Sequence, residues 1–251
     1  MKIVLSAILK NMKEMVDPRN LPFLFREVYG YIKDWFCFVR QYKGGYPVKM
    51  MPILFEKTSF SSFDPHYTYQ AYWAASWIDK LRTKDTQPHI DISSNISFVA
   101  QLCAANDVIQ VEYRPAKLSL PSYKKVSGDI LKLPFSNESI LSVSCLHVIE
   151  HIGLGRYGDS INANGCWKAL SELERIIAPG GRLYLSVPIG KPAVFFNGCY
   201  IFRAMDIVMA FAGLALVDFS YVNDDAVLIE SGKIEDTSGL EYGLGLFVFQ
   251  K

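Results

Sequence analysis

The sequence has no pattern of cysteines that would indicate a disulfide framework or a thiolate metal site. Its 5 cysteines are an odd number, and no two of them form a C-x-x-C pair. Most of them lie inside apolar runs, which is typical of buried free thiols in a reducing compartment. We therefore expect a cytoplasmic protein without disulfide bonds.

The chain also lacks an excess of charge and an apolar run long enough to cross a membrane. It carries 26 basic and 25 acidic residues, which gives no electrostatic reason to expect nucleic acid or a membrane as a partner. The longest apolar run, Ile207 to Val217, is shorter than the roughly 20 residues of a membrane-spanning helix. Lys10 and Lys13 interrupt the first apolar run, so a signal peptide is not expected. A small-molecule substrate is the predicted partner, and the sequence does not indicate an oligomeric state.

Residues 1–86 are predicted to be helical and irregular. From Pro22 to Arg40, apolar residues recur at helical spacing, and Gly44-Gly45 ends this pattern. A second helix is expected to begin at Asp64-Pro65 and to run towards Leu81, because Asp is a favoured N-cap and Pro suits the first helical position. We expect this part to form a helical cap on the rest of the chain.

Residues 87–251 alternate short apolar runs with amphipathic segments, which indicates strands and helices in turn. Seven strands are predicted, at about Pro88–Ile92, Val108–Glu112, Lys124–Val126, Ile140–Leu146, Leu183–Val187, Leu214–Val222 and Leu244–Phe249. The alternation predicts an α/β domain whose sheet is mostly parallel and carries helices on both faces. In such a sheet, ligands bind at the carboxyl ends of the strands.

Acidic side chains stand at these strand ends. Asp91 ends the first strand, and Glu112 ends the second at a spacing that suits an acceptor for ribose hydroxyls. Asp129 follows the third and could accept a hydrogen bond from an exocyclic amine such as that of adenine, although Gly128-Asp129 is equally typical of an ordinary turn.

The turn after Asp91 lacks the glycines that usually allow the backbone to approach a nucleotide. Ser93, Ser94 and Asn95 stand there instead. These residues are small and polar, so the turn can still accommodate a ligand, but tight binding of a large cofactor is less expected.

The strand at Ile140–Leu146 runs directly into a group of titratable side chains, His147, Glu150 and His151. A histidine oriented by a carboxylate suits general acid/base chemistry or one weakly held divalent cation. The same H-x-x-E-H order occurs in a helical zinc-protease motif, but no further ligand is evident here. Alternatively, Glu150 and His151 only cap the turn that follows.

The next loop, Gly153 to Asp159, is rich in glycine and carries Arg156 and Tyr157. Arg156 could bind a carboxylate or phosphate in bidentate fashion, or could pair with Asp159 at the surface. His66 and Tyr67, in the first turn of the helix after Asp64, either pack on the sheet or reach the substrate.

The order of these features resembles class I S-adenosylmethionine-dependent methyltransferases. The resemblance rests on the segments VEYRP, GDILKLPF, SVSCLHVIEHI and ELERIIAPGGRLYLSVP and covers about residues 88–251. It implies a Rossmann-like, seven-stranded fold with S-adenosylmethionine as the cofactor. The HVIEHIGLGRYGD run looks closest to an uncharacterised methyltransferase-like subgroup.

The resemblance also implies roles for individual residues. The cofactor-binding residues would be Asp91 and Ser93 at the methionine part, Glu112 at the ribose, Asp129 and Ile130 at the adenine, and Leu146 beside the sulfonium. The VIEH segment is similar to that of ubiquinone-pathway O-methyltransferases, in which carboxylates and a histidine can hold a divalent metal. Because His147 stands where those enzymes tend to have a glutamate, no metal is predicted.

We predict a methyltransferase that acts on a small polar acceptor, such as a sugar or a hydroxylated metabolite. The predicted catalytic residues are His147, Glu150 and His151, with His147 or His151 as the base and Glu150 orienting it. The predicted substrate contacts are His66, Tyr67, Arg156 and Tyr157. The alternative is a methyltransferase-like protein that serves as a binding or assembly partner without catalysis. A metal hydrolase that uses the histidine–glutamate group is a third reading.

Overall fold

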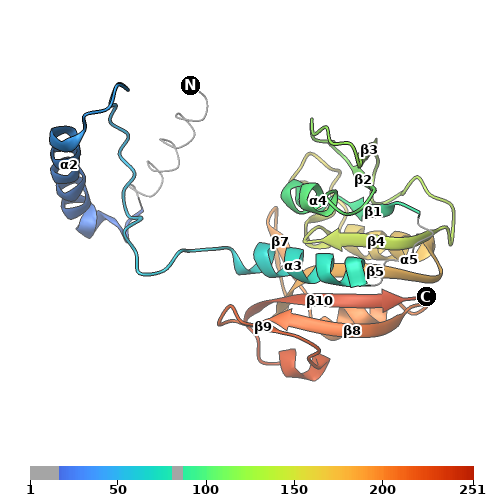
Figure 1. Ribbon diagram of the computed structural model, residues 1–251. Coiled ribbons are helices and arrows are strands. Elements are labelled where there is room, and N and C mark those ends of the chain that lie inside the picture. Colours follow the sequence, from blue (N-terminus) through green and yellow to red (C-terminus); the bar gives the residue numbers. More distant parts are fainter. Residues whose placement is uncertain (1–16, 81–86) are drawn as a thin grey trace. The chain divides into compact units, whose positions relative to one another are not determined.

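A computed structural model describes residues 17–80 and 87–251 (Figure 1). The chain divides into two compact units, Met1–Ser62 and Phe63–Lys251. The first contains the short helix η1 (Leu21–Phe23) and helix α2 (Leu24–Gln41), which confirms the helix expected there. The predicted domain boundary after residue 86 adjoins residues 81–86, which lie outside the described residues. The predicted cap on the α/β core stays a prediction.

The second unit is built on a sheet of eight strands in the order β3-β2-β1-β4-β5-β10-β8-β9 (Figure 1). The strands are β1 (His89–Ile92), β2 (Val108–Glu112), β3 (Tyr123–Ser127), β4 (Ile140–Leu146), β5 (Ile177–Gly190), β8 (Ala215–Val222), β9 (Leu228–Ile229) and β10 (Tyr242–Gln250). Strands β1 to β5 pair in parallel, whereas β10 pairs antiparallel with both β5 and β8. The sheet is therefore mostly parallel, as the alternating sequence predicts.

The predicted number of seven strands is wrong, because the sheet has an eighth. Strand β9 is only two residues long and pairs antiparallel with the end of β8. The turn that brings it back is held by the Asn223 side chain, which accepts the amide hydrogens of Asp225 and Val227. A short polar segment closed by a side chain gives no alternating apolar pattern, so the sequence did not indicate this strand. A separate hairpin of β6 (Ala193–Phe195) and β7 (Cys199–Ile201) was also not predicted.

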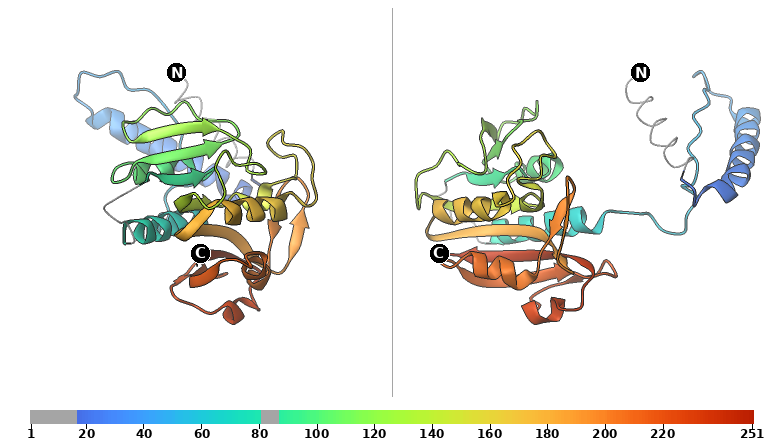
Figure 2. Two further views of the ribbon diagram at one scale, coloured as in Figure 1. Left: turned by 90° about the vertical axis from the view of Figure 1, so that its right-hand side faces the viewer. Right: turned by 180° about the vertical axis from the view of Figure 1, so that it is seen from behind.

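Helices cover both faces of the sheet, as expected. One hydrophobic cluster joins the sheet to α5 (Gly165–Ile176) and α6 (Ala204–Ala210), and a second joins it to α3 (Pro65–Lys80) and α4 (Ile96–Leu102). Figure 2 shows α5 and α6 in front when the molecule of Figure 1 is seen from behind. The two remaining short helices are η2 (Ile149–His151) and η3 (Ile234–Thr237).

Helix α3 begins where the sequence indicates. The Asp64 carboxylate accepts the amide hydrogen of Tyr67 at 3.0 Å, and Pro65 occupies the first helical position. The helix buries Trp73 and Ile78 against the sheet. It thereby fixes its first turn, which carries His66, near the carboxyl end of β4.

Two further predictions concern the cysteines and the possibility of a membrane span. All five cysteines are free, and Cys103, Cys145 and Cys166 are buried. Among the described residues, none of the helices combines the length and the apolar character that a membrane span requires.

The packing of α5 predicts the stability of a core variant. Leu173 is fully buried against the sheet, whereas Lys168 on the same helix is exposed. Leu173→Ala should lower the free energy of unfolding by roughly 2–5 kcal/mol, because it leaves a cavity in a close-packed cluster. Urea unfolding measures this, with Lys168→Ala as the control that should change little. Equal stability of the two variants would contradict the packing described.

Candidate functional site

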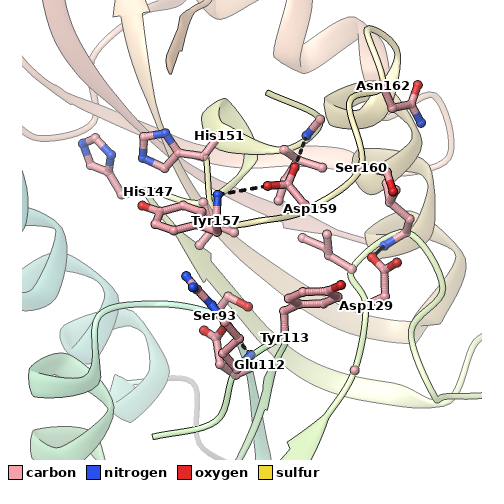
Figure 3. A pocket seen from close by; sticks show the side chains of 17 residues that line it. Ser93, Glu112, Tyr113, Asp129, His147, His151, Tyr157, Asp159, Ser160 and Asn162 are labelled. Atoms are coloured by element: carbon pink, nitrogen blue, oxygen red, sulfur yellow. Dashed lines mark hydrogen bonds between the residues drawn. The ribbon is translucent and has the colours of Figure 1, made fainter. Parts of the chain in front are cut away.

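A cavity of about 430 Å³ opens at the carboxyl ends of β1, β2, β3 and β4 (Figure 3). Its lining comes from the segments that follow these strands and from the loop after η2. The residues are Ser93, Glu112, Tyr113, Arg114, Gly128, Asp129, Ile130, Leu131, His147, Val148, His151, Ile152, Gly153, Tyr157, Asp159, Ser160 and Asn162. In Figure 3, Tyr157 lies between the two histidines and the strand ends that carry Glu112 and Tyr113.

Asp91 does not face this cavity. Its side chain is fully buried, and both carboxylate oxygens are engaged within the protein. One oxygen accepts hydrogen bonds from the Ser94 amide and the Gln110 side chain, each at 3.1 Å, and the other accepts the Ser144 hydroxyl at 2.7 Å. Burial raises the pKa of Asp91 to about 6, although these hydrogen bonds oppose the rise. Asp91 therefore ties the first turn to β2 and β4.

The turn after Asp91 is fastened a second time through Ser94. Its buried hydroxyl accepts the amide hydrogen of Leu146 at 3.0 Å, and its carbonyl accepts from Gln110 at 3.0 Å. Ser93 takes a left-handed backbone conformation, with φ at +56°, where glycine is more usual. The glycine-free turn is thus closed by its own side chains, and only Ser93 of this turn reaches the cavity.

The hydrogen atoms of this buried network have a defined direction. The Asp91 carboxylate can only accept, so the Ser144 hydroxyl donates to it and accepts from His89 Nε2 at 2.9 Å. His89 Nδ1 then accepts from the Ser142 hydroxyl at 2.7 Å. Burial lowers the pKa of His89 to about 3, which is consistent with this neutral ring.

These bonds predict how Asp91→Asn behaves. Because the pKa of Asp91 is higher in the folded protein than in the unfolded chain, protonation of Asp91 stabilises the fold. This contribution is fully present below about pH 4 and is lost as the pH rises through about 6. A rise from the usual 3.8 to about 6 is worth roughly 3 kcal/mol. In the Asn variant the amide would donate to Ser144 and the His89 tautomer would reverse, so the fold should persist. Urea unfolding at pH 4 to 7 should show that this pH dependence is lost, and an unchanged dependence would contradict the burial.

Glu112 and Asp129 stand on the open side of the strand ends. One oxygen of Glu112 accepts the Arg114 amide at 3.2 Å, and one oxygen of Asp129 accepts the Leu131 amide at 2.9 Å (Figure 3). Among the described residues, nothing engages the second oxygen of either carboxylate. Each acid is therefore oriented by its own turn and keeps an acceptor for a ligand.

His147 follows β4 directly and has both ring nitrogens engaged. Its Nδ1 contacts the Glu150 carboxylate, and its Nε2 lies 3.3 Å from His66 Nδ1. The Tyr67 ring stacks on the His147 ring with centroids 5.1 Å apart. Burial opposes a positive charge on His147, but the charge of Glu150 and its hydrogen bond outweigh burial and raise the pKa of His147. Burial lowers the pKa of His66 to about 4, so His66 is the neutral member of the pair.

His151 differs from His147, because one of its nitrogens is free. Its Nδ1 lies 2.7 Å from the carbonyl oxygen of Gly198, in the β6–β7 hairpin, so Nδ1 carries the proton. Its Nε2 is then unprotonated and lies 3.7 Å from Glu150. Burial lowers the pKa of His151 despite the carboxylate beside it. Within the part of the chain that the structure describes, the second oxygen of the fully buried Glu150 has no hydrogen-bond partner.

These protonation states predict an order of titration. In an NMR pH titration, His147 should titrate above a typical histidine, and His151 and His66 below it. Glu150→Gln should lower the pKa of His147, because burial would no longer be opposed by a charge. Glu230→Gln, an exposed acid elsewhere, is the matched control. A His147 that titrates below His151 would contradict this account.

His147, Glu150 and His151 are also the one group of this kind among the described residues that could hold a metal ion. Their ligand atoms all lie within 4.8 Å of one another. An ion would have to displace the proton that His147 shares with Glu150, whereas His151 Nε2 already has a free lone pair. The expectation of no metal stays a prediction.

The loop from Gly153 to Asp159 is built around the Asp159 carboxylate. This group accepts the amide hydrogens of Gly153, Gly155 and Tyr157 at 3.1 to 3.3 Å, and Figure 3 shows the bonds from Gly153 and Tyr157. Gly153 has φ at +83°, and a side chain there would collide with the backbone of Asn162. The pairing of Arg156 with Asp159, which the sequence left open, is absent from this part of the structure, since Arg156 instead donates to the Gly198 carbonyl at 3.2 Å.

The structure brings together most of the predicted site residues. Those that line the cavity are Ser93, Glu112, Asp129, Ile130, His147, His151 and Tyr157. The others lie behind this lining or beside it. Asp91, Leu146 and Glu150 are buried beneath it, His66 and Tyr67 contact His147, and Arg156 contacts His151 and Tyr157.

Sequence reasoning missed several lining residues. Tyr113 and Arg114 directly follow Glu112, so their place after a strand end was a usable signal. Ser160 and Asn162 gave none, because their position depends on how the loop folds around Asp159. The roles of all these residues stay predictions.

Solved structures share the fold of this chain at low sequence identity. The [4+2]-cyclase SpnF gives a TM-score of 0.51 at 11% identity, over 70% of this chain and 79% of that one. Geranyl diphosphate C-methyltransferase from Streptomyces coelicolor A3(2), in complex with Mg²⁺, geranyl diphosphate and S-adenosyl-L-homocysteine, gives 0.50 at 12%, over 73% and 79%. A protein provisionally described as a sarcosine dimethylglycine methyltransferase from Galdieria sulphuraria gives 0.50 at 13%, over 73% and 86%.

This similarity shows a Rossmann-like methyltransferase fold and leaves the reaction open. No curated protein matches the sequence. The model of one family, described as "Caenorhabditis protein of unknown function, DUF268", matches residues 88–251, which is more than half of the chain. The chain therefore belongs to the DUF268 family.

Proposed function

We propose that this protein binds S-adenosylmethionine in the cavity and transfers its methyl group to a small polar acceptor. The observation that carries the proposal is the pair of oriented carboxylates, Glu112 and Asp129, on neighbouring strand ends of one cavity that also contains a neutral histidine, His151. Its volume of about 430 Å³ is within the range of small-molecule sites.

The residues present fit a nucleoside cofactor. The free oxygen of Glu112 would accept from the ribose hydroxyls, and Asp129 with the buried Ile130 would hold the adenine. Ser93 reaches the cavity where a methionine part would lie. Asp91 and Leu146 are proposed to act indirectly, since they hold the turn rather than face the ligand. Bound S-adenosylmethionine would supply the electrophilic methyl group.

His151 is the proposed general base. Its Nε2 is unprotonated and free of a strong hydrogen bond, and the ring is neutral near pH 7. Nε2 would accept the proton that the acceptor hydroxyl loses when it is methylated. Glu150, 3.7 Å away, would stabilise the imidazolium that forms. Because both nitrogens of His147 are engaged, we assign it, with His66, to positioning Glu150.

A binding role without catalysis is the second candidate. The specific observation in its favour is the turn after Asp91, which is glycine-free and is closed by Ser94 on Leu146. The fold is compatible with reactions other than methyl transfer, since one neighbour is described as a cyclase. The two candidates differ in whether the cavity binds the cofactor at all.

Calorimetry with S-adenosylhomocysteine tests the proposal directly. The wild-type chain should bind it, and Glu112→Ala should weaken binding at least about tenfold, because a hydrogen bond to a charged group is lost. Glu230→Ala, an exposed acid outside the cavity, should bind like the wild type. No binding at millimolar ligand would rule out the methyltransferase and favour the non-catalytic role.

A further inference from the structure

Two arginines from different loops converge on one ring beside the cavity. The guanidinium carbon of Arg114, in the segment after β2, lies 5.3 Å from the centre of the Tyr157 ring, and that of Arg156 lies 5.2 Å from it. Tyr157 and Arg114 both line the cavity. Two positive charges thus lie against one aromatic ring.

Neither guanidinium has a carboxylate partner within residues 17–80 and 87–251. Arg114 engages Glu112 only through its backbone amide, and Arg156 donates to the carbonyl oxygen of Gly198. Asp159, the acid in the same loop, accepts hydrogen bonds from backbone amides with both of its oxygens. Among the described residues, both guanidiniums are therefore without a direct ion pair, although Asp159 keeps its negative charge beside them.

Stacking on a ring leaves the edge of a guanidinium free. Arginine binds oxyanions through its planar edge, where its N–H groups match two oxygens, while its face can rest on an aromatic ring. Tyr157 thus holds two such groups without occupying the N–H groups that would bind an anion. The backbone at Tyr157 is itself fixed by Asp159 at 3.1 Å.

Arg156 and Tyr157 also lie next to the proposed base. The Tyr157 and His151 rings meet edge to face with centroids 5.9 Å apart, and Arg156 Nη1 lies 3.2 Å from His151 Nδ1. A group held by Arg156 would therefore place neighbouring atoms of the same small molecule near His151.

We propose that the acceptor carries an oxyanion, a phosphate or a carboxylate, which Arg114 and Arg156 bind together on Tyr157. The identity of this molecule as a methyl acceptor rests on the proposed function, whereas the anion site does not. The acceptor would be a small hydroxylated acid or phosphate ester, with the hydroxyl directed to His151. This is narrower than a neutral sugar, which would not need two arginines that lack an ion pair.

Inorganic phosphate and acetate are the probes for the site, titrated into the full chain by calorimetry. The wild type should bind at least one of them, and Arg114→Gln and Arg156→Gln should each weaken binding at least about tenfold, because each removes a charged donor pair. The double variant should lose it. Lys168→Gln, on the exposed face of α5, is the matched control and should bind like the wild type. Preference for phosphate or for acetate distinguishes the two kinds of acceptor.

Several outcomes would overturn the proposal. The first is that the wild type binds neither anion at millimolar concentration. The second is that the double variant binds as tightly as the wild type. The third is that Lys168→Gln weakens binding as much as the arginine variants do, which would indicate attraction to surface charge in general. Thermal unfolding of each variant shows whether it is folded. Tyr157→Leu keeps both arginines and should therefore weaken anion binding less than the double variant does.

The outcome of the anion titration can be distinguished from that of the S-adenosylhomocysteine titration. If the wild type binds S-adenosylhomocysteine but neither anion, the oxyanion site is wrong and the methyltransferase proposal stands. If it binds phosphate through both arginines but not S-adenosylhomocysteine, the anion site stands and the methyl donor is wrong.

Discussion

The buried carboxylate of Asp91 is the interaction on which the functional edge of the sheet depends. It lies at the end of β1 and is joined to Gln110 of β2, to Ser144 of β4 and to the amide of Ser94. A charge in such a place is costly unless hydrogen bonds compensate it. Because every compensating group comes from a neighbouring strand or turn, the bonds that stabilise the carboxylate also set the relative positions of the strand ends. The segments that carry Glu112 and His147 leave the sheet from these fixed points.

Much of the fold follows from the order of apolar and amphipathic segments, and the site follows less completely. Glu112 and Asp129 were predictable because a residue after a parallel strand lies at the ligand edge whatever its surroundings. Asp91 has the same position in sequence, but it is buried and its oxygens bind Ser94, Gln110 and Ser144, and no local pattern reveals this. His151 depends on Gly198, whose hairpin the sequence did not indicate, so its free nitrogen could not be foreseen. The short strand β9 was missed for a similar reason, since a side chain of Asn223 closes it.

The two histidines of the H-x-x-E-H segment show how one carboxylate can produce different chemistry at two positions. Glu150 contacts His147 directly and favours its charged form, whereas at 3.7 Å it does not overcome the burial of His151. The spacing of the segment does not distinguish His147 from His151. The difference arises from the left-handed backbone at His147, with φ at +59°, and from the two outside partners, His66 and Gly198. A strained backbone at such a point is common in functional sites.

The attachment of the loop after η2 to Asp159 has a consequence for its motion. Three amides of the loop converge on one carboxylate. If the Asp159 side chain turned away, all three of these bonds would be lost together. Tyr157 would leave with them, and the arrangement of Arg114 and Arg156 would be lost in the same step. A molecule that needs both arginines would therefore favour the conformation in which Asp159 holds these amides.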